Sequence, residues 1–200
     1  MFMVLDIETD GMGTFRPPVQ RPIEVAWVVC EPSGDVRKRA KRLIGGVERI
    51  HPKATEVHGY TVEDVNPNGL EMDVVLKELE NDCLHHGVER VVGHNIDFDM
   101  GCLCHQDRLR LAGEEGDSLI PRFRSLPTFC TMRHGTPLCK LEWPFHRYNS
   151  RGENHYKWPK LKELATFAGV EVVDSKLHGA EYDVQITLEC YKKLFITGHS

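Results

Sequence analysis

Residues 3–11 read Met3-Val4-Leu5-Asp6-Ile7-Glu8-Thr9-Asp10-Gly11. Apolar and β-branched residues dominate this run and a glycine closes it, which predicts a core strand that leads into a turn. Side chains alternate along a strand, so Asp6 and Glu8 point to one side while Leu5 and Ile7 pack on the other. Two neighbouring carboxylates repel unless a cation lies between them, and Mg²⁺ or Mn²⁺ prefers such oxygen ligands. The alternative is a solvated edge strand with two surface acids.

The composition is that of an ordinary globular protein. The 200 residues, 40% of them hydrophobic and 28% charged, fit a single domain spanning 1–200. No apolar run approaches the ~20 residues that cross a bilayer, and no secretory pattern is present, so we expect a cytoplasmic protein without a membrane partner. The net charge of −5 argues against a protein that coats nucleic acid by bulk attraction. It still allows an enzyme that grips only a chain end.

The seven cysteines are an odd number and are scattered along the chain, which favours buried thiols over a disulfide framework. Two groups mix cysteine with histidine, but neither has the paired C-x₂₋₄-C spacing of a structural zinc site. These groups are Cys102, Cys104 and His105, and Cys130, His134, Cys139 and His146. Zinc is therefore not expected.

The periodicity of the chain predicts an α/β domain with a mixed sheet. After the opening strand, we expect strands at Ile23–Cys30, Val36–Ile44 and Arg90–Gly93, and a strand or helix within Leu126–Met132. Helices are expected at Lys53–Gly59, from Thr61, and at Leu70–His86, Asp97–Ala112, Pro159–Ala168 and Ala180–Phe195. Their apolar stripes include Leu84 and Leu109.

A second informative segment reads Val92-Gly93-His94-Asn95-Ile96-Asp97-Phe98-Asp99. A strand ends at Gly93, a polar turn follows, and Asp99 falls in the first turn of the next helix. Ligands of open α/β sheets gather at the carboxyl ends of strands, which makes Asp99 a candidate site residue. The alternative is that the acids here only favour the positive end of the helix dipole.

A third segment reads Leu177-His178-Gly179-Ala180-Glu181-Tyr182-Asp183. His178 lies just before a predicted helix and Asp183 lies in its first turns, so the imidazole is mobile while the carboxylate is fixed. The alternative is a structural histidine, since the chain contains 11 of them.

The three segments together resemble those of the DEDDh 3′–5′ exonucleases, the proofreading epsilon-subunit type found in phages and bacteria, within the ribonuclease H-like superfamily. The first motif of that family is similar to Asp6-Ile7-Glu8-Thr9. The second, in which the last aspartate is catalytic, is similar to His94-Asn95-Ile96-Asp97-Phe98-Asp99. The third, H-x-A-x-x-D, is similar to His178-Gly179-Ala180-Glu181-Tyr182-Asp183.

The resemblance implies a ribonuclease H-like fold, with a mixed five-stranded sheet flanked by helices. It also implies a metal-dependent 3′–5′ exonuclease that hydrolyses terminal phosphodiester bonds of DNA or RNA and releases nucleoside 5′-monophosphates. Two Mg²⁺ or Mn²⁺ ions would be held by Asp6, Glu8, Asp99 and Asp183, with Asp6 bridging them. His178 would serve as the general base, since imidazole titrates near working pH.

Substrate contacts follow from the same resemblance. The backbone of Thr9 and Asp10 is expected to lie against the terminal sugar. The segment His58-Gly59-Tyr60 matches one near the terminal nucleotide, where the ring of Tyr60 either stacks on a base or simply packs. Asn95 either orients the scissile phosphate region or caps the next helix.

An extended, irregular segment is expected at about 122–158. It interleaves basic and aromatic residues, which suits a single strand or a 3′ end, although a partner-binding surface is the alternative. These residues are Arg122, Arg124, Arg133, Lys140, Arg147, Arg151, Phe145, Tyr148 and Trp158. A polymerase or a second copy of the chain is a further candidate partner. Two other functions compete with the exonuclease: a binding module without turnover and an endonuclease of the same fold.

Overall fold

A computed structural model describes residues 1–11, 19–113, 116–143 and 156–197. Within these residues one five-stranded sheet has the order β3-β2-β1-β4-β5. The strands are β1 (Phe2–Thr9), β2 (Pro22–Cys30), β3 (Val36–Leu43), β4 (Arg90–Gly93) and β5 (Thr128–Cys130). The first three pair antiparallel, whereas β1, β4 and β5 run parallel. The predicted α/β architecture with a mixed five-stranded sheet is confirmed.

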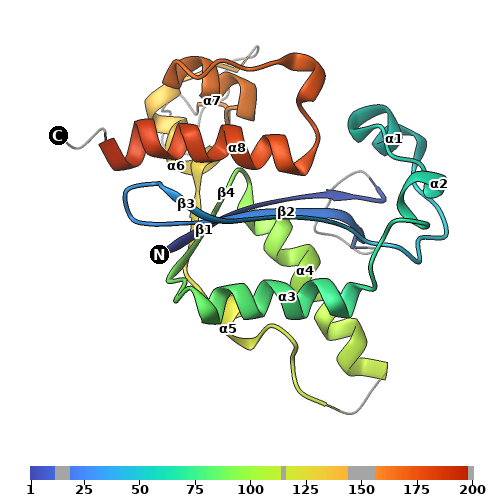
Figure 1. Cartoon of the computed structure of the whole chain (residues 1–200). Helices are drawn as coiled ribbons and strands as arrows, with labels where there is room; N and C mark the ends of the chain where they lie inside the picture. The colour runs from blue at the N-terminus through green and yellow to red at the C-terminus, as the bar shows by residue number, and fades with distance from the viewer. Residues whose placement is uncertain (12–18, 114–115, 144–155, 198–200) are drawn as a thin grey trace, which may run out of the picture.

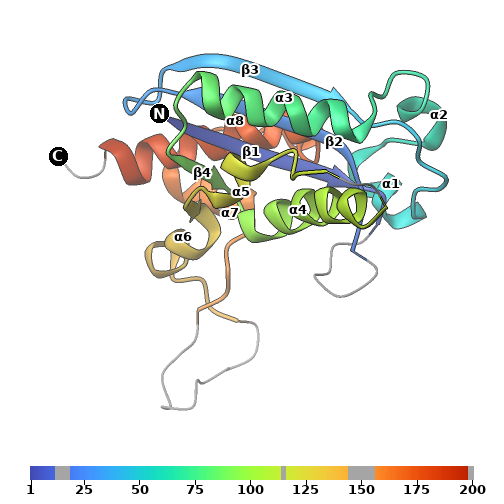
Figure 2. The same ribbon diagram turned by 90° about the horizontal axis from the view of Figure 1, so that it is seen from below.

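Helices cover both faces of the sheet (Figure 1). On one side lie α3 (Met72–His85), α4 (Ile96–Gly113) and α5 (Pro121–Ser125); on the other lie α6 (Thr131–Cys139), α7 (Leu161–Ala168) and α8 (Ala180–Tyr191). The view from below shows α3 and α4 side by side across the sheet (Figure 2). Two short helices, α1 (Pro52–His58) and α2 (Val62–Val65), lie beyond the carboxyl end of β1. None of the described helices is long and apolar enough to cross a membrane.

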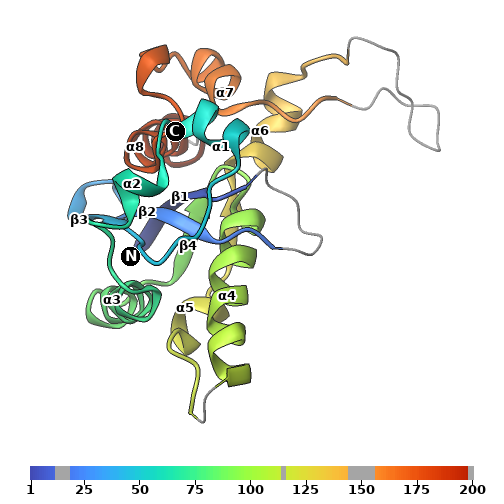
Figure 3. The same cartoon turned by 90° about the vertical axis from the view of Figure 1, so that its right-hand side faces the viewer.

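The alternation along β1 produces two separate apolar clusters. Met3, Leu5 and Ile7 are buried in the larger cluster, where they pack against α3 and α4. Phe2 and Val4 face the opposite side and pack against α8. Burial of each side chain of this size stabilises the folded state by about 1.5–3 kcal/mol. Because β1 buries side chains on both faces, packing from both sides fixes its position. The view along the strands shows this layering, with α7 and α8 on one face and α3 to α5 on the other (Figure 3).

Several expected details differ in the structure. Leu84 and Leu109 are 59% and 54% exposed, because each lies at the edge of its helix stripe and faces away from the sheet. The seventh helix begins at Leu161 and not at Pro159, since the carbonyl of Pro159 is bonded to His94 before the helix starts. The last α-helix ends at Tyr191 and continues as a short π-helix over Lys192–Ile196.

The segment 122–158 contains more regular structure than its sequence indicates. It includes most of α5, all of β5 and all of α6. Residues 144–155, with Phe145, Arg147, Tyr148 and Arg151, lie outside the described residues.

Candidate active site

The two acids of the opening stretch lie on the strand in the middle of the sheet. Asp6 and Glu8 continue the row of Phe2 and Val4 and emerge on the α8 face where the apolar packing ends. Their partners in the antiparallel register are Ala26 for Asp6 and Glu24 for Glu8. Because β1 is flanked by strands on both sides, the edge-strand alternative is wrong.

Asp183 reaches the same point from the first turn of α8. Oxygens of Asp6, Glu8 and Asp183 lie within 4.8 Å of one another. Asp183 Oδ2 accepts the backbone N–H of His178 (3.3 Å), whereas Oδ1 is buried without a hydrogen-bond partner in the described part of the chain. A buried carboxylate oxygen without a donor is costly, and a cation at the cluster would remove that cost.

Asp99 approaches from the neighbouring parallel strand. The ladder between β1 and β4 stops at Val4, which leaves the N–H of Ile7 beyond it, and Asp99 Oδ1 accepts this N–H at 3.2 Å. The turn needs glycine at position 93, since a Cβ there would lie 3.0 Å from the carbonyl oxygen of Leu5 and 2.7 Å from Cδ1 of Ile96. Asp99 is thus buried beside Asp6 but is not one of the three acids whose oxygens converge.

The electrostatics of the cluster are those of acids that lack a counter-charge. Burial, reinforced by the charges of Asp99, Glu8 and Asp183, raises the pKa of Asp6 well above its ordinary value. Burial and the charges of Asp183 and Glu24 raise the pKa of Glu8 to about 9. Burial raises the pKa of Asp183 to about 6, opposed by His178.

Burial likewise raises the pKa of Asp99 well above its ordinary value. The donor set consists of carboxylate oxygens, which suits Mg²⁺ or Mn²⁺. The unpartnered oxygen of Asp183 and the raised pKa values both fit a bound divalent cation. Among the described residues, no cysteine takes part in a group of this kind, and all seven cysteines are free.

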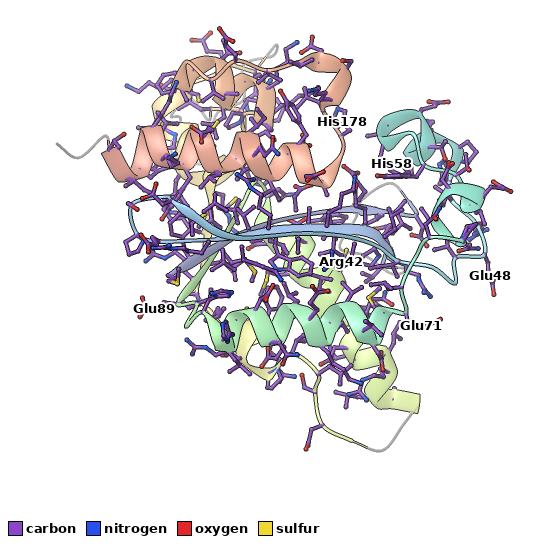
Figure 4. The ribbon with its side chains drawn as sticks, viewed as in Figure 1. Arg42, Glu48, His58, Glu71, Glu89 and His178 are labelled. Carbon is purple, nitrogen blue, oxygen red and sulfur yellow. The ribbon has the colours of Figure 1, made fainter. Side chains whose placement is uncertain are left out.

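His178 is exposed at the start of α8, on the same side of the sheet as His58 (Figure 4). Its φ of +66° is unusual for a residue with a side chain, and Asn95, in the second motif, has a φ of +70°. Non-glycine residues in this region of φ often mark functional sites. Asn95 accepts the N–H of Phe98 through its backbone carbonyl, and no side-chain bond from Asn95 to α4 is found among the described residues.

The residues expected near the terminal sugar hold the end of β1 in place. His58 Nδ1 accepts the N–H of Tyr60 (3.1 Å), so the ring proton lies on Nε2, which donates to the carbonyl of Thr9 (3.2 Å). Burial lowers the pKa of His58, which favours the neutral form of the ring. Asp10 binds Arg21 through both backbone and side chain, each at 2.9 Å.

A cleft of about 180 Å³ opens beside Glu8. Its walls are partly polar and partly apolar: Ile7, Glu8, Thr9, Gly11, Ala54, Val57, His58 and Phe98. Two of the residues predicted to bind substrate, Thr9 and His58, therefore do line a hollow next to the acids. Phe98 was missed, although it stands one residue before Asp99 in the second motif.

The ring of Tyr60 is packed partly inside the protein and is not presented freely for stacking on a base. Its ring packs against a cluster containing Ile23, Val47 and Val65, and its hydroxyl donates to Glu24 at 3.1 Å. The structure thus favours the packing alternative for Tyr60. Glu24 itself was missed, although an isolated acid in the apolar run Ile23–Cys30 is a visible signal.

Part of the basic segment is engaged within the protein. The guanidinium of Arg122 donates to the carbonyl of Val88, and Arg133 forms an ion pair with Asp97. Both Arg122 and Arg124 lie on α5, on the side of the sheet opposite α8 (Figure 1). These two arginines therefore do not extend the acid cluster toward a bound strand, whereas Trp158 is 59% exposed.

Comparison with known proteins assigns nearly the whole chain to a family. A family model described as "Exonuclease" (RNase T) matches residues 3–191. No curated protein sequence matches. Among solved structures, E. coli exonuclease I in complex with a dT13 oligonucleotide is similar at a TM-score of 0.69 and 18% identity, covering 98% of this chain and 41% of that one.

Two further structures described as ExoI are also similar, the first of them from E. coli. The zinc-ion-bound form of its complex with single-stranded DNA has a TM-score of 0.65 at 16% identity, over 96% of this chain and 40% of that one. The complex described as ExoI/SSB-Ct has a TM-score of 0.66 at 14% identity, with the same coverage. At these identities the similarity is one of fold, and the chain spans about two fifths of the length of exonuclease I. The predicted 3′–5′ exonuclease class with a ribonuclease H-like fold is confirmed.

Proposed function

Because the chain belongs to the RNase T exonuclease family, we propose that it shortens single-stranded nucleic acid from the 3′ end and releases nucleoside 5′-monophosphates. The observation that carries the proposal is the convergence of Asp6, Glu8 and Asp183 within 4.8 Å, with one oxygen of Asp183 buried and unpartnered. We further propose that residues 1–200 form one exonuclease domain.

The acids divide into two sets of ligands. Asp6, Glu8 and Asp183 would hold one divalent ion, Mg²⁺ or Mn²⁺, and Asp6 together with Asp99 would hold a second. Bound there, such ions supply the Lewis acidity that stabilises negative charge developing on the phosphate oxygens. The protein's part is to keep the four carboxylates in place, and the rigid strand β1 with its two apolar clusters serves that purpose.

His178 acts as the general base. Its imidazole accepts the proton of the attacking water as the new P–O bond forms and the bond from phosphorus to the 3′ oxygen of the penultimate nucleotide breaks. The released 3′ oxygen takes up a proton, and the product is a nucleoside 5′-monophosphate. The exposure of His178 suits this task, because its ring can reach substrate and afterwards lose the proton to solvent.

The cleft beside Glu8 accommodates the terminal nucleoside. Val57 and Phe98 offer apolar surface to a base, while Glu8, one of the clustered acids, lines the same cleft. The base contacts are apolar and therefore tolerate any base. The similarity to structures holding dT13 and dA16 oligonucleotides supports single-stranded DNA as the first substrate to test, with RNA beside it.

The decisive experiment uses 5′-labelled single-stranded DNA and RNA of the same sequence with Mg²⁺ or Mn²⁺. We expect a ladder that shortens from the 3′ end, no cleavage with EDTA, and no cleavage of a circular single strand. Cutting of the circle would indicate the endonuclease alternative. Metal-dependent binding without any product would indicate the binding-module alternative. A polymerase or second-copy partner stays a prediction.

A further inference from the structure

Glu24 is a fully buried acid that the mechanism above does not use. It is 0% exposed within β2, a strand whose other side chains from Ile23 to Cys30 are apolar. It pairs with Glu8 in the antiparallel register, so the two carboxylates share one face of the sheet. An acid in this position adds repulsion to a cluster of acids that already lacks a counter-charge. Another contribution of Glu24 must offset this electrostatic cost.

Three donors from three different parts of the chain satisfy Glu24. Oε1 accepts from Nζ of Lys41 on β3 (2.8 Å) and from the hydroxyl of Tyr60, which follows α1 (3.1 Å). Oε2 accepts the backbone N–H of Ala180 (3.1 Å). The last bond spans 156 residues of sequence and joins β2 to the first residue of α8.

The start of α8 depends on this outside acceptor. The helix is preceded by Gly179, which has no side chain, and no side-chain cap closes it. The first N–H groups of a helix have no partner within it, and an anion beside them is favourable. Glu24 is that anion. Asp183 follows three residues after Ala180, so the point at which α8 begins sets where its carboxylate lies relative to Asp6 and Glu8.

From these contacts we infer that Glu24 is a positioning residue, which docks the start of α8 on the sheet and thereby brings Asp183 to the metal-binding acids. The inference rests on the proposed function for its meaning, since Asp183 matters as a metal ligand. Lys41 reduces the electrostatic cost of burying Glu24, because its ammonium neutralises a carboxylate that would otherwise lie unpaired beside Glu8. Tyr60 completes the hydrogen bonds of Oε1.

The test variant is E24Q, which keeps the shape but turns one oxygen into a donor. With the amide oxygen toward Lys41, the NH₂ group faces the N–H of Ala180, and the docking bond is lost. We expect amide hydrogen exchange at Ala180 to become roughly tenfold faster and the Mn²⁺ dissociation constant measured by calorimetry to rise roughly tenfold, as for loss of a hydrogen bond to a charged group. The value of kcat should fall while KM changes little.

The matched control is E78Q, which breaks the ion pair between Arg42 of β3 and Glu78 of α3 on the other face. It should lower thermal stability without changing exchange at Ala180 or Mn²⁺ affinity. Equal loss of stability in both variants with unchanged Mn²⁺ affinity would overturn the inference. If E24Q does not fold, Y60F removes only one of the three donors and should give the same signature at smaller size.

A second variant separates positioning from simple capping. Gly179 has φ −124° and ψ 124°, values that serine adopts readily, and a Cβ there would come no closer than 3.8 Å to the carbonyl oxygen of Lys176. Adding G179S to E24Q supplies a local cap. We expect stability to recover while Mn²⁺ affinity stays low; recovery of both would show that Glu24 only caps the helix. Mn²⁺ binding and exchange need no turnover, so absence of exonuclease activity in the wild type would sink the proposed function separately.

Discussion

Two regions of this protein bury acids, and they treat them in opposite ways. Beneath the sheet, Glu80, Asp82 and Asp107 of α3 and α4 are no more than 9% exposed. Every one of them accepts hydrogen bonds from protein donors. Glu80 takes the N–H groups of the first turn of α5 at 2.8 and 2.9 Å, and Asp82 takes the indole N–H of Trp27 at 2.8 Å.

Asp107 follows the same rule, since it accepts the hydroxyl of Ser118 (2.6 Å) and the N–H of Leu119 (2.9 Å). At the end of β1 the rule is broken. The acids there face one another, one oxygen of Asp183 has no donor, and their pKa values are raised. Asp82 and Asp183 are both 9% exposed, so at equal burial the supply of donors distinguishes an acid that stabilises the fold from one suited to hold a cation.

Asp6→Asn is expected to have the largest effect on activity of the substitutions at these acids. If Asp6 holds a metal ion as proposed, its loss should remove several kcal/mol of transition-state stabilisation, on the order of a 10³-fold drop in kcat on 5′-labelled single-stranded DNA. Because one of the repelling charges disappears, the metal-free variant should melt at the same or a higher temperature than the wild type. A lower melting temperature together with retained activity would mean that Asp6 belongs with the structural acids.

His178→Gln tests the group that is not an acid. Loss of a general base costs about 10²- to 10⁴-fold in rate. His178 is exposed, and within the described residues its hydrogen bond to Asp183 comes from its backbone N–H, which the substitution keeps. Mn²⁺ binding and melting temperature should therefore stay close to those of the wild type. A rate within about threefold of the wild type would assign proton transfer to another group.

The pH dependence of stability should carry the signature of the unsatisfied acids. The pKa of Glu8 rises from 4.5 to about 9 and that of Asp183 from 3.8 to about 6. The folded state therefore holds more protons than the unfolded state between pH 4 and 9, and metal-free stability falls as the pH rises through that window. Bound cations replace the protons, so Mg²⁺ or Mn²⁺ should stabilise the protein more at pH 8 than at pH 5.5.

The size of that stabilisation follows from mass action. A cation at about a hundred times its dissociation constant contributes about 2.7 kcal/mol, or roughly 5–10 °C in melting temperature for a chain of this length. Thermal scans at both pH values, with and without metal, measure it. Asp6→Asn supplies the control, since it should abolish most of the shift. An equal metal effect at the two pH values would contradict the raised pKa values.

Local patterns predicted the parts of the site that are local. The alternation in residues 3–11 placed Asp6 and Glu8 on one face of a strand, and strand–turn–helix punctuation placed Asp99 and Asp183 in the first turns of helices. Glu24 could not be assigned a role in this way. Its partners lie 17, 36 and 156 residues further along the chain, and only the three-dimensional arrangement brings Lys41, Tyr60 and Ala180 to it.

The difference between local patterns and contacts distant in sequence also explains where the structure departs from smaller expectations. Periodicity identifies a helix stripe but not which residue at its edge meets the sheet, which is why Leu84 and Leu109 are exposed. Pro159 looked like a first-turn proline, but its carbonyl is held by His94 from another motif, so the helix starts two residues later. For Tyr60 the sequence left stacking on a base and ordinary packing open, because its bond to Glu24 cannot be read from the sequence.

Glu80→Gln is expected to have the smallest effect. It should have the opposite outcome to Asp6→Asn, with stability reduced and activity kept. The amide can accept only one of the two N–H groups at the start of α5 and turns a donor toward the other, which should cost about 1–3 kcal/mol in the free energy of unfolding. Activity per folded molecule should not change, because α5 lies on the far side of the sheet from the acid cluster. Urea unfolding and the single-strand assay on the same preparation measure the two quantities, with the exposed acid Glu56 of α1 mutated to Gln as a neutral control. Unchanged stability with lost activity would show that donor supply does not separate the two kinds of buried acid.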